Sequence, residues 1–372
     1  MASGDRKKRR KRSSAVVLLS GLFGLVIIAI LVLGGVTAYG LHLFYEPGPK
    51  DADTPFLVER GSNLNAVTQD LVAQGFTQDG ALQPLVFRAA IELLHLKGSK
   101  LLPGQYIMPA HASMDDMLRV VTQTKPQEFF VNVVPGETSW QVAQALNNPG
   151  LNLTGDPVTP PPEGSLLAVR HDFFPGDSRK SVIDGMQKKM ADTVADIWAK
   201  RDPAIDDVIG SPADLVTMAS LVEKETGIDS ERPDVASVFL NRLRKHMRLQ
   251  TDPSVIYGIT LGQQKLDRPL TTRDLGSKTP YNTYQIDGLP AGPIANPGVD
   301  ALEAVAHPSK TSFLYFVAKG PDPKDGHTFA STYAEHRRNV LKYRQAVASD
   351  EAEQAKEQLE EEQAKDAGDT TQ

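Results

Sequence analysis

The chain has 372 residues, which suggests about two or three domains, and 40% of them are hydrophobic, enough for substantial cores. The formal net charge is −6, and residues 6–12, RKKRRKR, hold seven basic side chains, so the chain after them is clearly acidic. This balance argues against a nucleic-acid groove in the folded part. The absence of cysteine excludes disulfides, thiolate nucleophiles and thiolate metal sites.

A long uncharged segment follows the basic run. Residues 13–45 contain no Asp, Glu, Lys or Arg, and their apolar core is longer than the roughly 20 residues that a helix needs to cross a bilayer. We predict an uncleaved, single-pass helix in the cytoplasmic (inner) membrane. Its basic tail, residues 1–12, is expected in the cytoplasm and the remaining chain outside it. The alternative is a cleavable signal peptide, whose apolar region is typically only about 7–15 residues long.

A compact α+β module is predicted at 54–124, after a Pro- and acid-rich linker at 46–53. FLVER alternates like a strand, and Ser62 is placed to cap the helix that follows it. GQYIM predicts a second strand, and Ser113 opens a further helix. Between them, a helix at about 81–96 carries apolar side chains at Leu82, Leu85, Val86, Ala89, Leu93 and Leu94.

A second domain of mixed α+β structure is predicted at 128–345. It begins with the strand FFVNVVPG, and a helix follows. Residues 147–164 are too rich in Pro and Gly for regular structure and predict a loop or groove wall. An amphipathic helix is expected at 179–200. The acidic, aromatic-free end, 346–372, predicts a disordered tail or a frayed helix.

The stretch MASLVEKETG contains the most informative carboxylate of the chain. Ser211 and Pro212 open its helix well, as cap and first residue. Helical spacing puts one apolar stripe in line with Glu225, whereas Glu223 falls on a different face. Burial and the C-terminal helix dipole would both raise the pKa of Glu225, as a general acid requires. The alternative is that Glu225 pairs with Lys or Arg at a solvated helix end. The stripe consists of Leu215, Met218, Ala219 and Val222.

Two later segments add polar and aromatic groups. Asp252-Pro253 is expected to open a helix, with Asp252 as its cap, and capping is also the purely structural explanation for this aspartate. TPYNTYQIDGLPAGPIANPG, 279–298, predicts a rigid loop with aromatic rings and amides, a combination that suits sugar rings. An ordinary Pro/Gly surface turn is the alternative.

These motifs together resemble a known family. LVTMASLVEKET, ASVFLNRLRKHMRLQTDPSVIYG, YNTYQIDGLPAGPIANPG, AVAHPSKTSFLYFVAKG and GHTF are similar, in this order, to the endolytic murein transglycosylases, the YceG-like proteins. The similarity covers about 55–340. It implies a LysM-like module at 54–124 and a catalytic domain that cleaves the β-1,4 bond between N-acetylmuramic acid and N-acetylglucosamine in peptidoglycan. It also places the catalytic glutamate on Glu225, the residue that the helical spacing singles out independently.

The resemblance further implies the chemistry. Ordinary glycosidases need two carboxylates. Lytic transglycosylases instead use the C6 hydroxyl of the muramic acid, so one glutamate can serve as acid and then as base, without metal or cofactor. Asn241 and Arg242 can equally hold the fold, and His307 and His327 are expected to be structural hydrogen bonders. The positions implied to line the glycan groove are Gln250, Thr251, Asp252, Tyr257, Asn282 and Tyr284.

One segment departs from the family pattern. After PEGSLL the family continues with a Pro-acid-Thr-Tyr-like segment, but here AVRHDFF stands, with His171 at the Tyr-like position. We hypothesise that Arg170 and His171 face peptide-stem carboxylates. Two rival functions stay open, a non-catalytic peptidoglycan-binding scaffold and a hydrolytic muramidase on the same fold. The implied partners are nascent peptidoglycan glycan strands and peptidoglycan synthases (penicillin-binding proteins).

Overall fold

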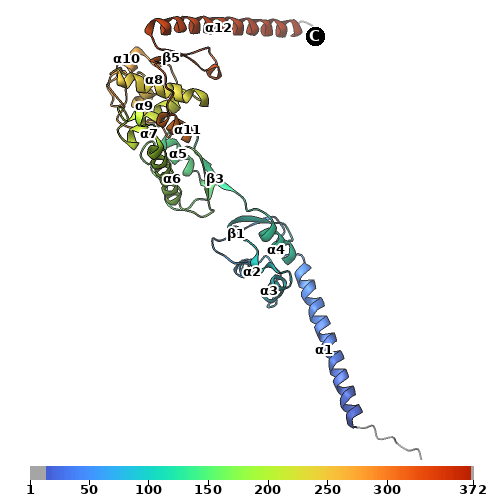
Figure 1. Cartoon of the computed structure of the whole chain (residues 1–372). Coiled ribbons are helices and arrows are strands. Elements are labelled where there is room, and N and C mark those ends of the chain that lie inside the picture. Colours follow the sequence, from blue (N-terminus) through green and yellow to red (C-terminus); the bar gives the residue numbers. More distant parts are fainter. Residues whose placement is uncertain (1–13, 370–372) are drawn as a thin grey trace, which may run out of the picture. The chain divides into compact units, whose positions relative to one another are not determined.

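The computed structural model describes residues 14–369 and divides the chain into two compact units, residues 1–128 and residues 129–372 (Figure 1). Each unit has a hydrophobic core of its own. The architecture of the described residues is mixed α+β with a long apolar helix near the N-terminus, which agrees with this part of the predicted fold class.

The first unit combines the long helix with a small α+β module. The two strands β1 and β2 pair antiparallel, with Thr54 opposite Met108, and the helices cover them. α1 is long and apolar enough to cross a membrane, a property that a signal sequence shares. The elements are α1 (Ser14–Tyr45), β1 (Thr54–Val58), α2 (Leu64–Ala73), α3 (Gln83–Leu93), η1 (Leu96–Gly98), β2 (Gly104–Met108) and α4 (Met114–Gln123).

Helix caps in this unit follow the sequence closely, with one shift. Ser113 opens α4 in a capping box with Asp116, as predicted. The cap of α2 is Asn63 rather than Ser62, because the Asn63 side chain accepts a 3.0 Å hydrogen bond from the backbone N–H of Ala66. Both residue types suit this position, so composition alone did not separate the two neighbours.

The segment 46–53 is not a free linker. The Gly48 N–H donates to the His111 carbonyl at 3.2 Å, and the His111 N–H donates to the Lys50 carbonyl at 2.8 Å. A Cβ on Gly48 would lie 2.5 Å from the Ala112 carbonyl oxygen, so only glycine permits this approach. Pro and acidic residues exclude a regular element here, but they do not prevent a fixed irregular backbone that is hydrogen bonded to the module.

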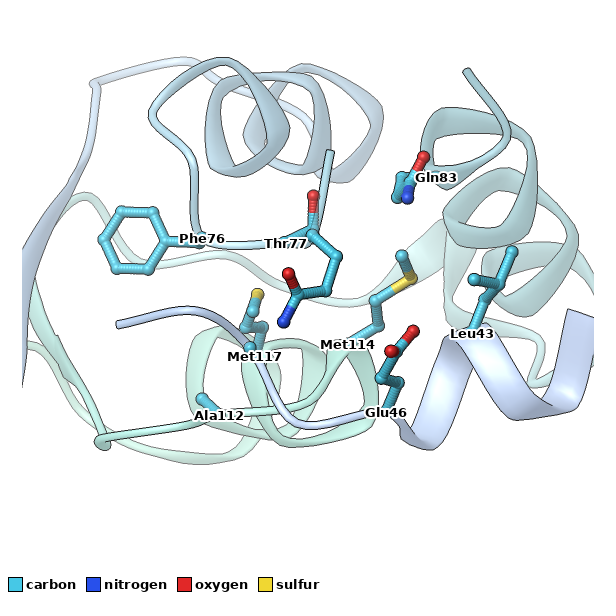
Figure 2. Close-up of a pocket in the computed structure, with 10 residues that line it drawn as sticks. Leu43, Glu46, Phe76, Thr77, Gln83, Ala112, Met114 and Met117 are labelled. Carbon is cyan, nitrogen blue, oxygen red and sulfur yellow. The ribbon is translucent and has the colours of Figure 1, made fainter. Parts of the chain in front are cut away.

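The last turn of α1 belongs to the module. Phe44 is buried in the module's core. Figure 2 shows Leu43 and Glu46 beside a small cavity that Met114 and Gln83 also line. The module therefore loses a core side chain if the chain is cut after α1.

The helix α3 presents a different face to the core than its leucines suggested. Its buried side chains are Gln83, Phe87, Ala90 and Ile91. Leu85 and Leu93, by contrast, have exposed fractions of 60% and 78%. The aromatic ring of Phe87 supplies the core contact, and the more numerous leucines stay outside.

The second unit is predominantly helical, with two small antiparallel sheets. β3 pairs with β4, and β5 pairs with β6. The longer elements are β3 (Phe129–Asn132), α5 (Ser139–Leu146), β4 (Arg170–Phe173), α6 (Arg179–Lys200), α7 (Pro212–Glu225), α8 (Arg232–Arg244), α9 (Asp252–Thr260), α10 (Thr272–Leu275), α11 (Val299–Ala306), β5 (Tyr315–Ala318), β6 (His327–Ala330) and α12 (Tyr333–Asp369). Short 3-10 turns lie at Pro149–Leu151, Pro203–Ile205, Asp229–Glu231 and Pro323–Asp325.

α12 runs from Tyr333 to Asp369 and so includes the acidic segment, for which a frayed helix was one of the two expectations; residues 370–372 lie outside the described part. The physical reason is composition, because Ala, Glu, Gln and Lys are strong helix formers even where packing contributes little.

Asn296 fastens three segments of the second unit together. Its side chain is fully buried. Its Oδ1 accepts a 3.0 Å hydrogen bond from the Leu166 N–H, and its Nδ2 donates to the Glu137 carbonyl at 3.1 Å. The loop before α5, the loop before β4 and the loop before α11 therefore share one buried amide.

We predict that Asn296→Ala lowers the free energy of unfolding of the second unit by about 2 kcal/mol, because buried hydrogen-bonding groups lose their partner. Denaturant unfolding followed by circular dichroism measures the change. Lys189→Ala, on the exposed face of α6, is the control and should change stability by less than about 0.5 kcal/mol. Equal stability of both variants would contradict the fastening role.

Candidate active site

α7 carries the two glutamates to opposite environments. Ser211 caps the helix by accepting a hydrogen bond from the Asp214 N–H, and Pro212 occupies the first turn, as predicted. The predicted stripe of Leu215, Met218, Ala219 and Val222 is fully buried in the core. The helix ends at Glu225, so the stripe carries this carboxylate to the edge of the core.

Glu223 is held as a paired charge. Only 4% of its side chain is exposed, and its Oε1 lies 3.0 Å from an Nη of Arg232. Its Oε2 accepts a 2.9 Å hydrogen bond from the Gly298 N–H. Arg232 also contacts Asp229. A buried carboxylate that contacts a guanidinium and a backbone donor is typical of a structural role.

Glu225 lacks such a direct cationic partner among its hydrogen bonds. The Thr251 hydroxyl donates to its Oε1. Burial is the largest cause that raises the pKa of Glu225, and the negative charge of Asp252 raises it further. The Thr251 hydrogen bond and the nearby charges of His327 and Arg242 act in the opposite direction. The alternative, in which Glu225 pairs with Lys or Arg at a solvated helix end, therefore does not match the structure.

The loop that carries Thr251 is fixed by a second threonine. The Thr251 N–H donates to Thr283 Oγ1 at 3.0 Å, and the Gln250 N–H donates to the Thr283 carbonyl at 3.2 Å. Thr283 and Thr251 are both buried. The two polar segments that the sequence indicated, LQTDP and YNTY, are thus hydrogen bonded to each other, and Thr251 connects them to Glu225.

Asp252 and Tyr284 lie at the rim of this arrangement. The Tyr284 hydroxyl donates to Asp252 Oδ1 at 2.6 Å. Burial and this hydrogen bond raise the pKa of Tyr284, which keeps the phenol protonated. Asp252 is not the cap of α9, contrary to expectation. Thr251 occupies that position without a capping hydrogen bond from its side chain, which is engaged with Glu225 instead.

The remaining predicted groove residues have other surroundings. Asn282 is fully buried and holds its own loop, because its Nδ2 donates to the Ser277 carbonyl at 2.6 Å and its Oδ1 accepts from the Tyr284 N–H at 2.9 Å. Gln250 is exposed and adopts a left-handed backbone, with φ of 49°. The structure thus brings Thr251, Asp252 and Tyr284 to Glu225.

Tyr257 points to a second carboxylate that sequence reasoning missed. Its hydroxyl donates to Glu163 Oε2 at 3.2 Å, and its ring packs edge-on against Tyr281. Glu163 Oε1 also accepts from the Ser139 N–H at 2.8 Å. Burial raises the pKa of Glu163. The available signal in the sequence was the Glu163-Gly164 pair at the end of the Pro-rich loop. This pair alone does not indicate a site, because the sequence does not show that Tyr257 binds it.

Asn241 and Arg242 bind backbone carbonyls. Asn241 Nδ2 donates to the Thr311 carbonyl at 2.9 Å, and Arg242 Nε donates to the Leu314 carbonyl at 2.7 Å. Arg242 also contributes a positive charge near Glu225. His327 Nδ1 lies 2.8 Å from Glu231, and His307 lies 3.6 Å from Glu303. These contacts agree with the expected structural roles.

Four residues of the departing segment AVRHDFF, Arg170–Phe173, form β4. His171 is only 7% exposed, and its Nε2 lies 2.8 Å from the Leu167 carbonyl. Burial lowers the pKa of His171, so this ring stays neutral and faces the interior. Arg170 lies over the Phe130 ring and pairs with Asp172 at 2.7 Å. The hypothesis that His171 faces stem carboxylates is therefore wrong, because the alternation of β4 turns it inward.

Comparison with known proteins decides the family. The model of the YceG-like family matches residues 56–342. The chain belongs to the YceG-like family. A relative from Bacillus subtilis (strain 168), named endolytic murein transglycosylase, is 31% identical over 349 residues, which cover 84% of this chain and 91% of the relative.

Further similar proteins include two more relatives and one solved structure. Two proteins of Streptococcus pneumoniae with the same name are 32% and 37% identical over 183 residues, which cover 49% of this chain and 32% of each relative. A crystal structure of a putative YceG-like protein from Listeria monocytogenes has 25% identity and a TM-score of 0.47, over 77% of this chain and 98% of that one. Within residues 14–369, no cluster of three or more His, Asp or Glu side chains is arranged for a metal ion.

The contrast between the two glutamates predicts opposite effects on stability. Because the folded-state pKa of Glu225 is raised, its contribution to stability is complete below the unfolded pKa of about 4.3 and is lost as pH rises through the folded pKa. Glu225→Gln keeps an acceptor for Thr251 without the charge. It should therefore raise the unfolding midpoint at neutral pH, and the gain should vanish at acidic pH.

Glu223→Gln is the matched comparison. It removes the buried one of the two carboxylates that pair with Arg232, which should cost about 3 kcal/mol. Thermal unfolding of both variants between acidic and neutral pH provides the measurement. A loss of stability in Glu225→Gln as large as that in Glu223→Gln would show that Glu225 is also a structural ion.

Proposed function

We propose that the chain is a membrane-anchored lytic transglycosylase that cleaves the β-1,4 bond between N-acetylmuramic acid and N-acetylglucosamine in peptidoglycan. The observation that carries this proposal is Glu225, a carboxyl group with a hydroxyl partner and a pKa raised by burial. Such a group is protonated over a wider pH range than an ordinary glutamate, as a general acid must be. The names of the relatives supply the substrate class, murein.

The proposed reaction needs one carboxyl group. Protonated Glu225 donates its proton to the glycosidic oxygen as the bond from that oxygen to C1 of the muramic acid breaks. The C6 hydroxyl of the same sugar then bonds to C1, and its proton returns to the Glu225 carboxylate. The products are a 1,6-anhydro end and a free 4-hydroxyl, and no water is consumed. Intramolecular attack supplies the effective molarity that replaces a second carboxylate.

The groove residues take distinct parts in this proposal. Thr251 orients the Glu225 carboxyl, and Asp252, Tyr284 and the exposed Gln250 are available to sugar hydroxyls and amides. Asn282 stabilises its own loop through the Ser277 carbonyl, and Tyr257 stabilises the site through its hydrogen bond to Glu163. The buried amide and hydroxyl hydrogen bonds keep these loops in place before the glycan arrives, which lowers the entropic cost of binding.

A hydrolytic muramidase is the second candidate, and Asp252 is the observation that favours it. Its negative charge acts on Glu225, so two carboxyl groups are near one another. In a hydrolase Asp252 would activate water. Its Oδ1, however, already accepts a hydrogen bond from the Tyr284 hydroxyl at 2.6 Å, so this oxygen is not free to bind water. A non-catalytic scaffold would have no use for an acid with a raised pKa.

The location follows from the first unit. We propose that α1 is retained as an anchor, with the basic tail 1–12 in the cytoplasm, because Phe44 contributes to the core of the module. The strand–helix–helix–strand unit at 54–124 would be the LysM-like module. Such an anchor would direct the activity to nascent strands near the membrane, with peptidoglycan synthases as partners in line with the family resemblance.

Product analysis tests the reaction. The detergent-solubilised chain should release glycans with 1,6-anhydro ends from purified peptidoglycan, and Glu225→Gln should lower the rate by about 10²- to 10⁴-fold. Mass spectrometry of the new ends is the measurement. Asp252→Asn serves as the comparison and should keep the anhydro product. Reducing ends that disappear in Asp252→Asn would establish the hydrolase instead.

The pH dependence tests the protonation state of the acid. Because the pKa of Glu225 is raised, kcat/KM should stay high above the range where an ordinary glutamate ionises and then fall as pH rises through the folded pKa. Thr251→Val removes a hydrogen bond that lowers this pKa, so the falling limb should move to higher pH. An unchanged limb would mean that another group controls it.

A further inference from the structure

The outer face of α3 is unusually apolar for a soluble surface. Leu85 and Leu93 are exposed on the side of the helix opposite Phe87, and Leu82 and Leu94 at its ends are exposed as well. A single exposed leucine is ordinary, but four around one helix form a patch of the kind that marks an interaction site.

This patch, consisting of Leu82, Leu85, Leu93 and Leu94, is continuous with the membrane-spanning candidate. α3 contacts α1, and the two helices enclose an apolar groove of about 460 Å³. Val36, Gly40 and Phe44 line it from α1, and Leu85, Ala89 and Leu93 line it from α3. The Thr37 hydroxyl in the lining is satisfied within its own helix, because it donates to the Leu33 carbonyl at 2.8 Å.

The level of the groove along α1 indicates where the bilayer surface lies. Tyr39 and Tyr45 are exposed near the C-terminal end of the apolar helix. Tyrosine is typical of the membrane–water interface, since its ring is apolar and its hydroxyl is polar. The groove contains both tyrosines in its lining, so α3 reaches the same depth as this interface.

We propose that α3 lies in the interfacial layer of the outer leaflet of the membrane that α1 crosses, with its leucine patch towards the acyl chains, and that the α1–α3 groove holds a phospholipid acyl chain. This rests on the proposed function of α1 as a retained anchor. The occupant is lipid because the patch continues the surface of α1, whose described side chains from Leu18 onwards are largely exposed apolar groups. Helices of this kind bury an apolar face at the acyl boundary.

The absence of cysteine makes a direct test possible, because each single-cysteine variant can carry one spin label. The full chain is placed in vesicles of phosphatidylcholine and phosphatidylglycerol. Labels at Leu85→Cys and Leu93→Cys report on the patch. Val32→Cys in α1 reports on membrane insertion itself, and Gln69→Cys on the exposed side of α2 reports on water. Collision with oxygen indicates lipid, and collision with a nickel chelate indicates water.

We expect the labels at 85, 93 and 32 to collide preferentially with oxygen, and the label at 69 to collide several-fold more with nickel. Nickel access at 85 and 93, with lipid access at 32, would overturn the docking of α3 and leave the anchor intact. Nickel access at 32 would overturn the anchor. Protection of 85 and 93 from both reagents would show that a second protein copy covers the patch and would also overturn the proposal.

To exclude a local effect of the labels, Leu85→Glu together with Leu94→Glu is combined with the label at 93. Both sites are exposed, so the fold of the module is retained. Charges on this face are costly in the acyl region, and nickel access at 93 should therefore rise several-fold. Hydrogen exchange at the amide of Leu71, which is buried in the same module, is the control for folding. Its rate should be unchanged in the double variant. Unaltered nickel access at 93 would contradict lipid contact.

Discussion

The site depends on one constraint, that the pKa of Glu225 is raised because burial keeps water from its carboxyl group while its hydrogen bond comes from a neutral hydroxyl. α7 meets this constraint through its buried stripe, which ends at Glu225. Two residues earlier the same helix has Glu223, which contacts a guanidinium and accepts a hydrogen bond from a backbone N–H. The separation of an acid from a structural ion therefore follows from helical geometry, because two steps turn the side chain by more than half a revolution.

The surrounding loops follow from the same constraint. A desolvated carboxyl group needs a neutral donor, and Thr251 supplies it. Thr251 is in turn held by a neutral group, because its N–H donates a hydrogen bond to the Thr283 hydroxyl. Asn282 fixes Thr283's loop with hydrogen bonds to backbone carbonyls. A chain of hydroxyls and amides thus leads away from Glu225 through Thr251, Thr283 and Asn282, and these hydrogen bonds hold the two loops in place.

Sequence reasoning was accurate where one element decides the outcome. The stripe of α7, the cap Ser211 and the strand β2 depend on local periodicity and local side chains, and the structure has all three. It failed where the partner is distant in sequence. It did not reveal the partner of Tyr257, whose hydroxyl donates to Glu163, 94 positions away, while the place of Tyr257 in the glycan groove stays a prediction. Asp252 was expected to cap a helix, yet it accepts from Tyr284 instead. The leucines of α3 have helical spacing, but periodicity cannot say which of two apolar faces meets the core.

The fastening of 46–53 has a mechanical consequence. A flexible tether would let the module move through a volume that grows with tether length. Holding the module close to the end of α1 would then cost conformational entropy of the tether. Here Gly48 and His111 join the segment after α1 to the module itself, and Phe44 lies in the module's core. With α1 as the proposed anchor, the module's height above the bilayer is set by the rigid last turn of a helix. The position of the module relative to the membrane surface is then set by its packing against the end of α1.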